Sequence, residues 1–173
     1  MPRQVIKINP YSEKSIDEAI KQLKLLKQEI NFKTIELINR LADIGIQTIE
    51  SNKYSYGDSD FNDMRSYAWL EYDGNGARVT LVLSGKDVAF IEFGAGIHFN
   101  GSVGQSPNPF GSNLGYTIGS YGLGKGANDS WTYYDRDLGR YKTSHGTKAA
   151  MPMAKADEEI KRQFIQIAKE VFG

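Results

Sequence analysis

The sequence predicts an α+β domain in which a small antiparallel sheet packs against a long N-terminal helix and a C-terminal helix. Three observations lead to this class. Apolar residues recur at helical spacing over residues 15–52 and 153–172, they alternate around a tight turn over 64–84, and glycines crowd a long loop over 94–130. The order helix, hairpin, loop, hairpin, helix is typical of helices on one face of a sheet. We expect a single domain, 1–173.

The first predicted helix spans residues 15–52. Ile, Leu and Ala recur at steps of three and four residues, and Ser15 with Glu18 matches a capping box. The phase of the stripe shifts near Asn31, and Gly45 weakens a helix by about 1 kcal/mol, so the pattern fits one bent helix or two. A continuous helix would be longer than about 50 Å and would have to bury part of its stripe outside a small domain.

Two β-hairpins follow. In the first, over residues 64–84, the small residues at 73–76 accept the positive φ of a tight turn, and the alternation that begins at Ala77 makes one strand face the more buried. The second, over residues 131–143, is rich in Trp and Tyr and turns at 136–139. A stripe of Ala, Ile, Phe and Val then predicts the last helix.

The loop over residues 94–130 carries glycines every few residues, with aromatic side chains between them. Structureless loops of more than about 15 residues are uncommon inside a small domain, and they are generally functional or become ordered against a partner. This loop is therefore a first indication of assembly.

Composition excludes several classes of protein. Lys and Arg total 21, as do Asp and Glu, so no net charge favours nucleic acid or a membrane surface as a partner. The absence of Cys excludes disulfides and thiolate metal sites. The first residues lack the apolar core of a signal peptide, and no segment has the roughly 18 apolar residues of a membrane helix. We expect a soluble protein made in cytoplasm.

Candidate catalytic groups are few. Glu92, His98 and His145 could suggest a metal or acid-base site, but their spacing matches none of the His and Glu patterns that place ligands on one helix face. We expect no cofactor, no metal and no enzymatic activity. Two alternatives stay open. One is a small hydrolase that uses Glu92 with either histidine, and the other is a carbohydrate-binding module with an exposed row of Trp131, Tyr133 or Tyr141.

Three segments carry a resemblance to a known family. They are Phe90-Ile-Glu-Phe-Gly-Ala-Gly-Ile97, Trp131-Thr-Tyr-Tyr-Asp135 and His145-Gly-Thr-Lys-Ala-Ala-Met-Pro-Met-Ala-Lys-Ala156. In order and approximate spacing, residues 64–173 resemble the tail-completion, or head-to-tail joining, proteins of long-tailed bacteriophages. That family carries Pro-x-Asp-Thr-Gly-x-Leu-Arg-x-Ser before its first hairpin, whereas this chain has only Met64-Arg65-Ser66 there.

The resemblance implies a structural virion protein of the phage neck or tail, assembled in the host bacterial cytoplasm. It implies a homo-oligomeric ring, of six subunits in the expected case, which completes the tail and joins it to the head. The implied partners are head connector or adaptor proteins and a tail terminator or tail tube protein, with no membrane and no sequence-specific nucleic acid. A tail terminator or connector adaptor at a neighbouring neck position is the alternative within this class.

The same resemblance suggests which residues form contacts between subunits. We predict an interface at Glu92, Phe93, Gly94, Gly96, His98, Phe99, Phe110, Tyr116, Tyr121 and Trp131. In this interpretation Phe93 packs on the core, Glu92 makes a polar contact or sets the ring register, and the glycines turn the chain into the loop. Replacement of Glu92 by Ala is expected to leave the monomer folded and to weaken assembly.

Overall fold

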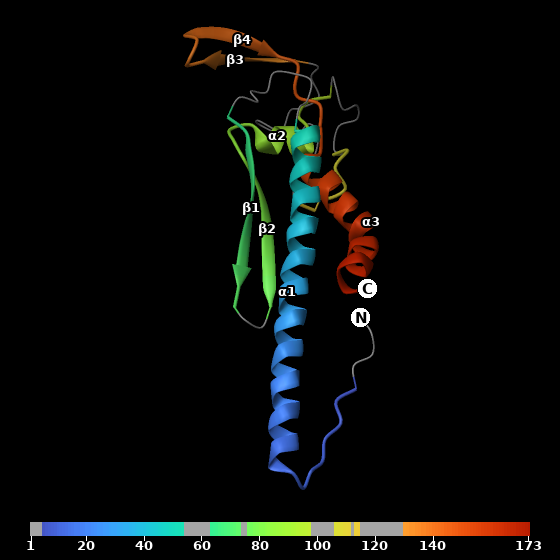
Figure 1. The fold of residues 1–173 in the computed structure, drawn as a ribbon. Helices are drawn as coiled ribbons and strands as arrows, with labels where there is room; N and C mark the ends of the chain where they lie inside the picture. The colour runs from blue at the N-terminus through green and yellow to red at the C-terminus, as the bar shows by residue number, and fades with distance from the viewer. Residues whose placement is uncertain (1–4, 54–62, 74–75, 98–105, 112, 115–129) are drawn as a thin grey trace.

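A computed structural model describes residues 5–53, 63–73, 76–97, 106–111, 113–114 and 130–173 (Figure 1). The elements in chain order are α1 (Glu13–Asn52), β1 (Arg65–Tyr72), β2 (Ala77–Ser84), α2 (Val88–Phe93), β3 (Trp131–Asp135), β4 (Arg140–Ser144) and α3 (Pro152–Phe172). The predicted α+β class, with its long N-terminal helix, C-terminal helix and antiparallel pairing, is confirmed.

Helix α1 is one continuous helix of 40 residues, about 60 Å long, and not two. It begins two residues earlier than predicted, because Ser12 is its N-cap and the Ser12 hydroxyl accepts a hydrogen bond from the Ser15 amide at 3.4 Å. The predicted capping box at Ser15 is therefore wrong. The hydroxyl of Ser15 instead accepts a hydrogen bond from the backbone of Asn9 at 2.9 Å.

The strands in the described part of the chain form two separate two-stranded sheets, β1 with β2 and β3 with β4, and not one small sheet. The first hairpin lies along α1, whereas the second lies beyond the end of that helix (Figure 1). The predicted alternation in β2 holds over residues 77–81, where Val79 and Leu81 are partly buried and Arg78 and Thr80 are exposed, but Val82 on the opposite face is partly buried as well. Leu81 approaches Gly45 of α1, where a Cβ would lie 2.3 Å from Leu81 Cδ1.

Helix α3 runs antiparallel to α1 and covers one side of it. Near one end of the pair, Lys155 Nζ donates a hydrogen bond to Asn52 Oδ1 at 2.9 Å, and toward the other end Arg40 and Glu170 form an ion pair. Between these contacts lies the core cluster of Leu41, Ile167 and Val171, with Leu37, Ile44, Ile160 and Phe172 packed against it. The core thus sits on residues 33–52 of α1, which we call the covered half.

The other half of α1, residues 13–32, extends past the elements that cover it and is called the projecting half (Figure 1). Near its end, Asn31 Nδ2 donates a hydrogen bond to the hydroxyl of Tyr72 in the first hairpin at 3.1 Å. Of the five buried residues of α1, only Ala19 lies in this half. The large apolar side chains exposed here are Ile16, Ile20, Leu23, Leu25, Ile30 and Phe32.

Candidate functional site

The carboxylate of Glu92 caps the start of helix α3. Glu92 lies in the short helix α2 and is only 6% exposed. Its Oε2 accepts a hydrogen bond from the Met153 amide at 2.8 Å, and its Oε1 accepts one from the Ala154 amide at 3.0 Å. The first amides of a helix have no partner within the helix, and the N-cap residue, Met151, has no side-chain oxygen to offer them. Glu92 therefore supplies from another helix what α3 lacks locally.

Asn108 completes the arrangement around this carboxylate. Its Nδ2 donates to Glu92 Oε1 at 2.6 Å and to the Glu92 carbonyl oxygen at 3.2 Å, and only 2% of the residue is exposed. Its Oδ1 accepts a hydrogen bond from the Phe110 amide at 2.9 Å. The sequence analysis missed Asn108. The available signal was an amide placed between Pro107 and Pro109, where prolines restrict the backbone on both sides.

Backbone contacts join the segment around Glu92 to the segment that leads into α3. The Ile91 carbonyl accepts a hydrogen bond from the Ala150 amide at 2.8 Å, and Ala95 and Thr147 exchange two hydrogen bonds at 2.9 and 3.0 Å. Gly146 has φ +92°, and a Cβ there would lie 2.1 Å from the Ala95 oxygen, so the close approach requires glycine. Two of the segments that carry the family resemblance are thus bonded to each other.

The predicted interface residues fall into three groups. Glu92, Phe93 and Phe110 line one cavity of about 450 Å³ between α2, residues 106–114 and the start of α3. Gly94 and Gly96 have positive φ as the chain leaves α2, and Trp131 packs against Gly96. His98, Phe99, Tyr116 and Tyr121 lie outside the described residues.

The prediction for Glu92 needs a correction. A residue that is 6% exposed offers almost no surface to a second subunit, and its oxygens accept hydrogen bonds from Asn108, Met153 and Ala154 of the same chain. The expected polar contact is present, but it holds α2, the segment around Asn108 and the start of α3 together within one chain. Of the other described members of the set, Gly94 and Gly96 are buried and Phe93 is partly buried, whereas Phe110 and Trp131 are 46% and 40% exposed.

The hairpin β3–β4 presents aromatic side chains on both of its faces. Trp131 and Tyr133 are two residues apart in β3 and therefore lie on the same face, where they line a cavity of about 750 Å³ that also borders α2. On the other face Tyr134 and Tyr141 meet edge to face, with ring centroids 5.3 Å apart. Because the rings are divided between two faces, Tyr141 does not extend the row formed by Trp131 and Tyr133.

The arrangement around Glu92 is suited to holding structure and not to moving protons. Its two carboxylate oxygens already accept three hydrogen bonds from buried or partly buried donors. Of the two histidines, His145 is exposed and His98 lies outside the described residues. Within the described ranges, no group of three or more His, Asp or Glu side chains could hold a metal ion.

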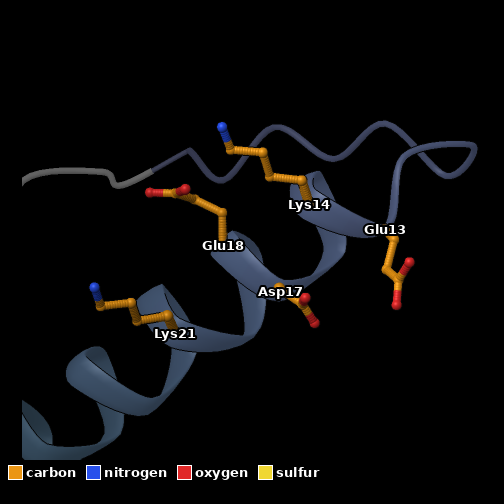
Figure 2. Close-up of a pocket in the computed structure, with 5 residues that line it drawn as sticks. All are labelled: Glu13, Lys14, Asp17, Glu18 and Lys21. Carbon is orange, nitrogen blue, oxygen red and sulfur yellow. The ribbon is translucent and has the colours of Figure 1, made fainter.

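A charged hollow of about 400 Å³ lies at the start of α1. Figure 2 shows its side chains pointing in different directions along the first turns of the helix and not converging on one point. Its residues are Glu13, Lys14, Asp17, Glu18 and Lys21. Carboxylates and ammonium groups are mixed along one solvated helix, so the side chains around the hollow do not form a site of one charge that would select a ligand.

Two carboxylates link α1 to neighbouring elements, Glu170 through an ion pair with Arg40 and Glu50 through a hydrogen bond from Ser66 of β1. Arg40 hydrogen-bonds Glu170 of α3 and lowers the pKa of that carboxyl, with a further contribution from Gln166. Lys53, followed by Ser66 of β1, lowers the pKa of Glu50 in the same way. Both carboxylates lie at the surface, so each pair contributes little to stability on its own.

Comparison of the chain with protein-family models, with curated proteins and with solved structures gives no match. Among the described residues, no helix combines the length and the apolar character needed to cross a membrane.

Proposed function

We propose that the chain is a structural virion protein of the neck or tail of a long-tailed phage. In this proposal it forms a homo-oligomeric ring that completes the tail and joins it to the head connector, and it has no enzymatic activity. Its partners are copies of itself, a connector or adaptor protein on the head side, and a terminator or tube protein on the tail side. The motifs over residues 64–173 that resemble the tail-completion family are the source of this assignment.

The observation that carries the proposal is the projecting half of α1. Its leucines Leu23 and Leu25 are 52% and 56% exposed, and Phe32 is 71% exposed, along about 30 Å of helix. Exposed apolar surface of this extent typically marks a contact with another protein. Among the described residues, each hairpin is a sheet of two strands, so its outer edges can accept a further strand. A subunit of a larger assembly has this combination of features.

The position of Glu92 also supports a structural role. It was the most suggestive candidate for chemistry in the sequence, and its oxygens are occupied by the amides that open α3. A hydrolase built on Glu92 would have to release these hydrogen bonds and expose the start of a helix.

The test is the mass of the purified protein by light scattering over a wide concentration range, repeated with phage tails or heads that lack the protein. Binding at one end of such particles, with or without ring formation in solution, supports a neck or tail component. The end that is bound separates tail completion from a terminator or adaptor position. A chain that binds neither particle contradicts the proposal.

A carbohydrate-binding platform is the second candidate, because Trp131, Tyr133 and Tyr141 are 40%, 37% and 75% exposed. Exposed rings of this kind can stack on sugars. Only Trp131 and Tyr133 share a face, which leaves a platform of two rings beside the cavity at α2. Titration with an oligosaccharide panel, monitored by Trp fluorescence, distinguishes the two functions. If an oligosaccharide quenches the Trp fluorescence of the wild type but not that of Trp131→Ala, carbohydrate binding is favoured.

A further inference from the structure

The projecting half of α1 has two apolar faces that lie opposite each other. A helix turns by about 100° per residue, so Ile16, Ile20, Leu23 and Ile30 fall on one side, which we call the seam face. Leu25 and Phe32 are seven residues apart and fall on the opposite side, which we call the back face. All six side chains are at least 40% exposed. A surface helix of a monomer needs one apolar face, and this helix has two.

The seam face continues a contact that already exists within the subunit. Steps of three and four residues link Ile16 to Ile30 by way of Ile20, Leu23 and Leu26. After one seven-residue step from Ile30, the same spacing resumes at Leu37, Leu41 and Ile44. These last residues belong to the core and pack against α3. Helix α3 ends at Phe172, which packs at that same cluster, and beyond this end residues 5–12 run along the α3 side of the projecting half (Figure 1). The stripe still stays open there, since Ile16, Ile20, Leu23 and Ile30 are 40–52% exposed. A second helix packed on the seam face would cover it.

The N-terminal segment does not serve as this cover. Residues Lys7 and Ser12 border a hollow on the side of α1 that carries Ser15, Ala19 and Gln22. Ala19 is accordingly buried, with 4% exposed, whereas Ile20 beside it is 45% exposed. Residues 5–12 thus lie mainly against the side of the helix that carries Ser15, Ala19 and Gln22, next to the seam face, and the six apolar side chains of the two faces stay at least 40% exposed.

We propose that the seam face of one subunit packs against the back face of the next subunit, so that the projecting halves of α1 form a ring of side-by-side helices. The inference rests on the ring proposed above. A cyclic ring uses a heterologous contact, in which each subunit presents two different surfaces, one to each neighbour. Two unlike apolar faces on opposite sides of one helix meet this requirement, whereas a single docked partner or a two-fold dimer needs only one.

Charge does not oppose this packing. Residues 13–32 contain four Lys (14, 21, 24 and 27) and four acidic residues (13, 17, 18 and 29), so the segment has no net charge. Neighbouring copies therefore meet without overall repulsion. Each subunit in a closed ring makes the contact twice, which strengthens an interaction that is weak between two isolated helices.

Leu23 and Leu25 provide a matched test. They are the same residue type, 52% and 56% exposed, and lie on opposite faces because two positions correspond to about 200° of turn. Full-length wild type, Leu23→Glu, Leu25→Glu and the control Gln28→Glu, at an exposed polar position, are compared by light scattering at increasing concentration. Circular dichroism checks that the helix content is unchanged.

We expect wild type and Gln28→Glu to self-associate into a closed ring and each Leu variant alone to lose this association. A mixture of Leu23→Glu and Leu25→Glu retains one intact pair of faces, so it should form a heterodimer of twice the 19.3 kDa monomer mass and nothing larger. No two-fold contact predicts this mixing result.

Three outcomes overturn the inference. If Leu25→Glu associates like wild type while Leu23→Glu does not, only the seam face is used and the contact is isologous. If both variants still form rings, other surfaces hold the ring, and the proposed function stands without this contact. If wild type stays monomeric at the highest concentration reached, the two faces do not bind each other. Binding of that monomer to tails or heads would then decide the proposed function separately.

Discussion

The covered and projecting halves of α1 share one helix and one apolar stripe but differ in what lies against them. Four of the five buried residues of α1 belong to residues 33–52. The elements that cover this half are short, since α3 has 21 residues, about 31 Å, and each strand of the first hairpin has 8 residues, about 27 Å. Helix α1 is about twice as long as its covers. The difference teaches that about half of α1 lies beyond the elements that pack on it, and this is the half that the proposed ring contact would use.

The largest expected effect is on the free energy of unfolding, when one isoleucine from each half of α1 is replaced by alanine. Ile49 is fully buried in the covered half, and Ile49→Ala should lower the free energy of unfolding of the monomer by about 4 kcal/mol, because it leaves a cavity in the core. Ile20 is 45% exposed, and Ile20→Ala should cost less than about 1 kcal/mol, since Ala is also the better helix former. Urea unfolding measures both. Equal losses would mean that the projecting half is as well packed as the covered half.

The next effect concerns the start of the helix that covers α1. Glu92→Ala removes the acceptor of two helix amides and leaves them buried, so we expect a loss of about 3 kcal/mol in the free energy of unfolding. This prediction replaces the expectation from sequence that Glu92→Ala leaves the monomer folded. Glu158→Ala, at an exposed carboxylate of the same helix, is the matched control and should change the stability by less than about 0.5 kcal/mol. An unchanged urea midpoint for Glu92→Ala would show that the cap contributes nothing.

Hydrogen exchange sharpens the comparison along the helix itself. In the monomer, amides of residues 33–52 should exchange mainly through global unfolding, whereas amides of 13–32 should open locally at a free energy lower by about 2 kcal/mol or more. Mass spectrometry of peptides from each half measures this difference. Ring formation through the projecting half should slow exchange in 13–32 and leave 33–52 nearly unchanged. Uniform protection in the monomer would contradict the division into two halves.

The smallest effect is that of acid pH. The pKa of Glu170 is lowered in the folded chain, first by Arg40, so this ion pair stabilises the fold above the unfolded pKa near 4.5 and is lost as pH falls through the folded pKa. The pKa of Glu159 is also lowered, to about 2, chiefly by Arg162. Both of these residues belong to α3, so their pair does not join two elements. Glu170→Gln should reduce the loss of stability between pH 4.5 and lower values by a small amount, because the pair is exposed to solvent. If the free energy of unfolding depends on pH in the same way for Glu170→Gln and wild type, the pair of Arg40 and Glu170 does not contribute to acid sensitivity.

Much of the fold could be predicted because its signals are local. The spacing of apolar residues placed the last helix within one residue of its observed start at Pro152, and the turn at residues 73–76 placed the first hairpin. Helix α2 was missed as a helix, since six residues contain too few turns to show a period and its residues are apolar on nearly every side. Its packing role was still indicated by the apolar run around Glu92.

The candidate site was only partly predictable. Its residues come from α2, the segment around Asn108 and the start of α3, and their hydrogen bonds span 16 to 62 positions along the chain. No periodicity or turn pattern reports a contact of that range. The carboxylate in an apolar run was recognised as unusual, but a buried carboxylate can serve a subunit interface or a helix start equally well until its donors are known.

The sequence by itself determined the first and last helices and the two hairpins, because these depend on neighbours within a few residues. It also showed that a continuous first helix would be too long for a small domain, but not that the helix is continuous. Only the tertiary structure decided that the two hairpins form separate sheets, that Glu92 caps α3, and where along α1 the cover ends. The physical reason is that these features depend on which distant segments come into contact, and on how long each covering element is relative to the helix it covers.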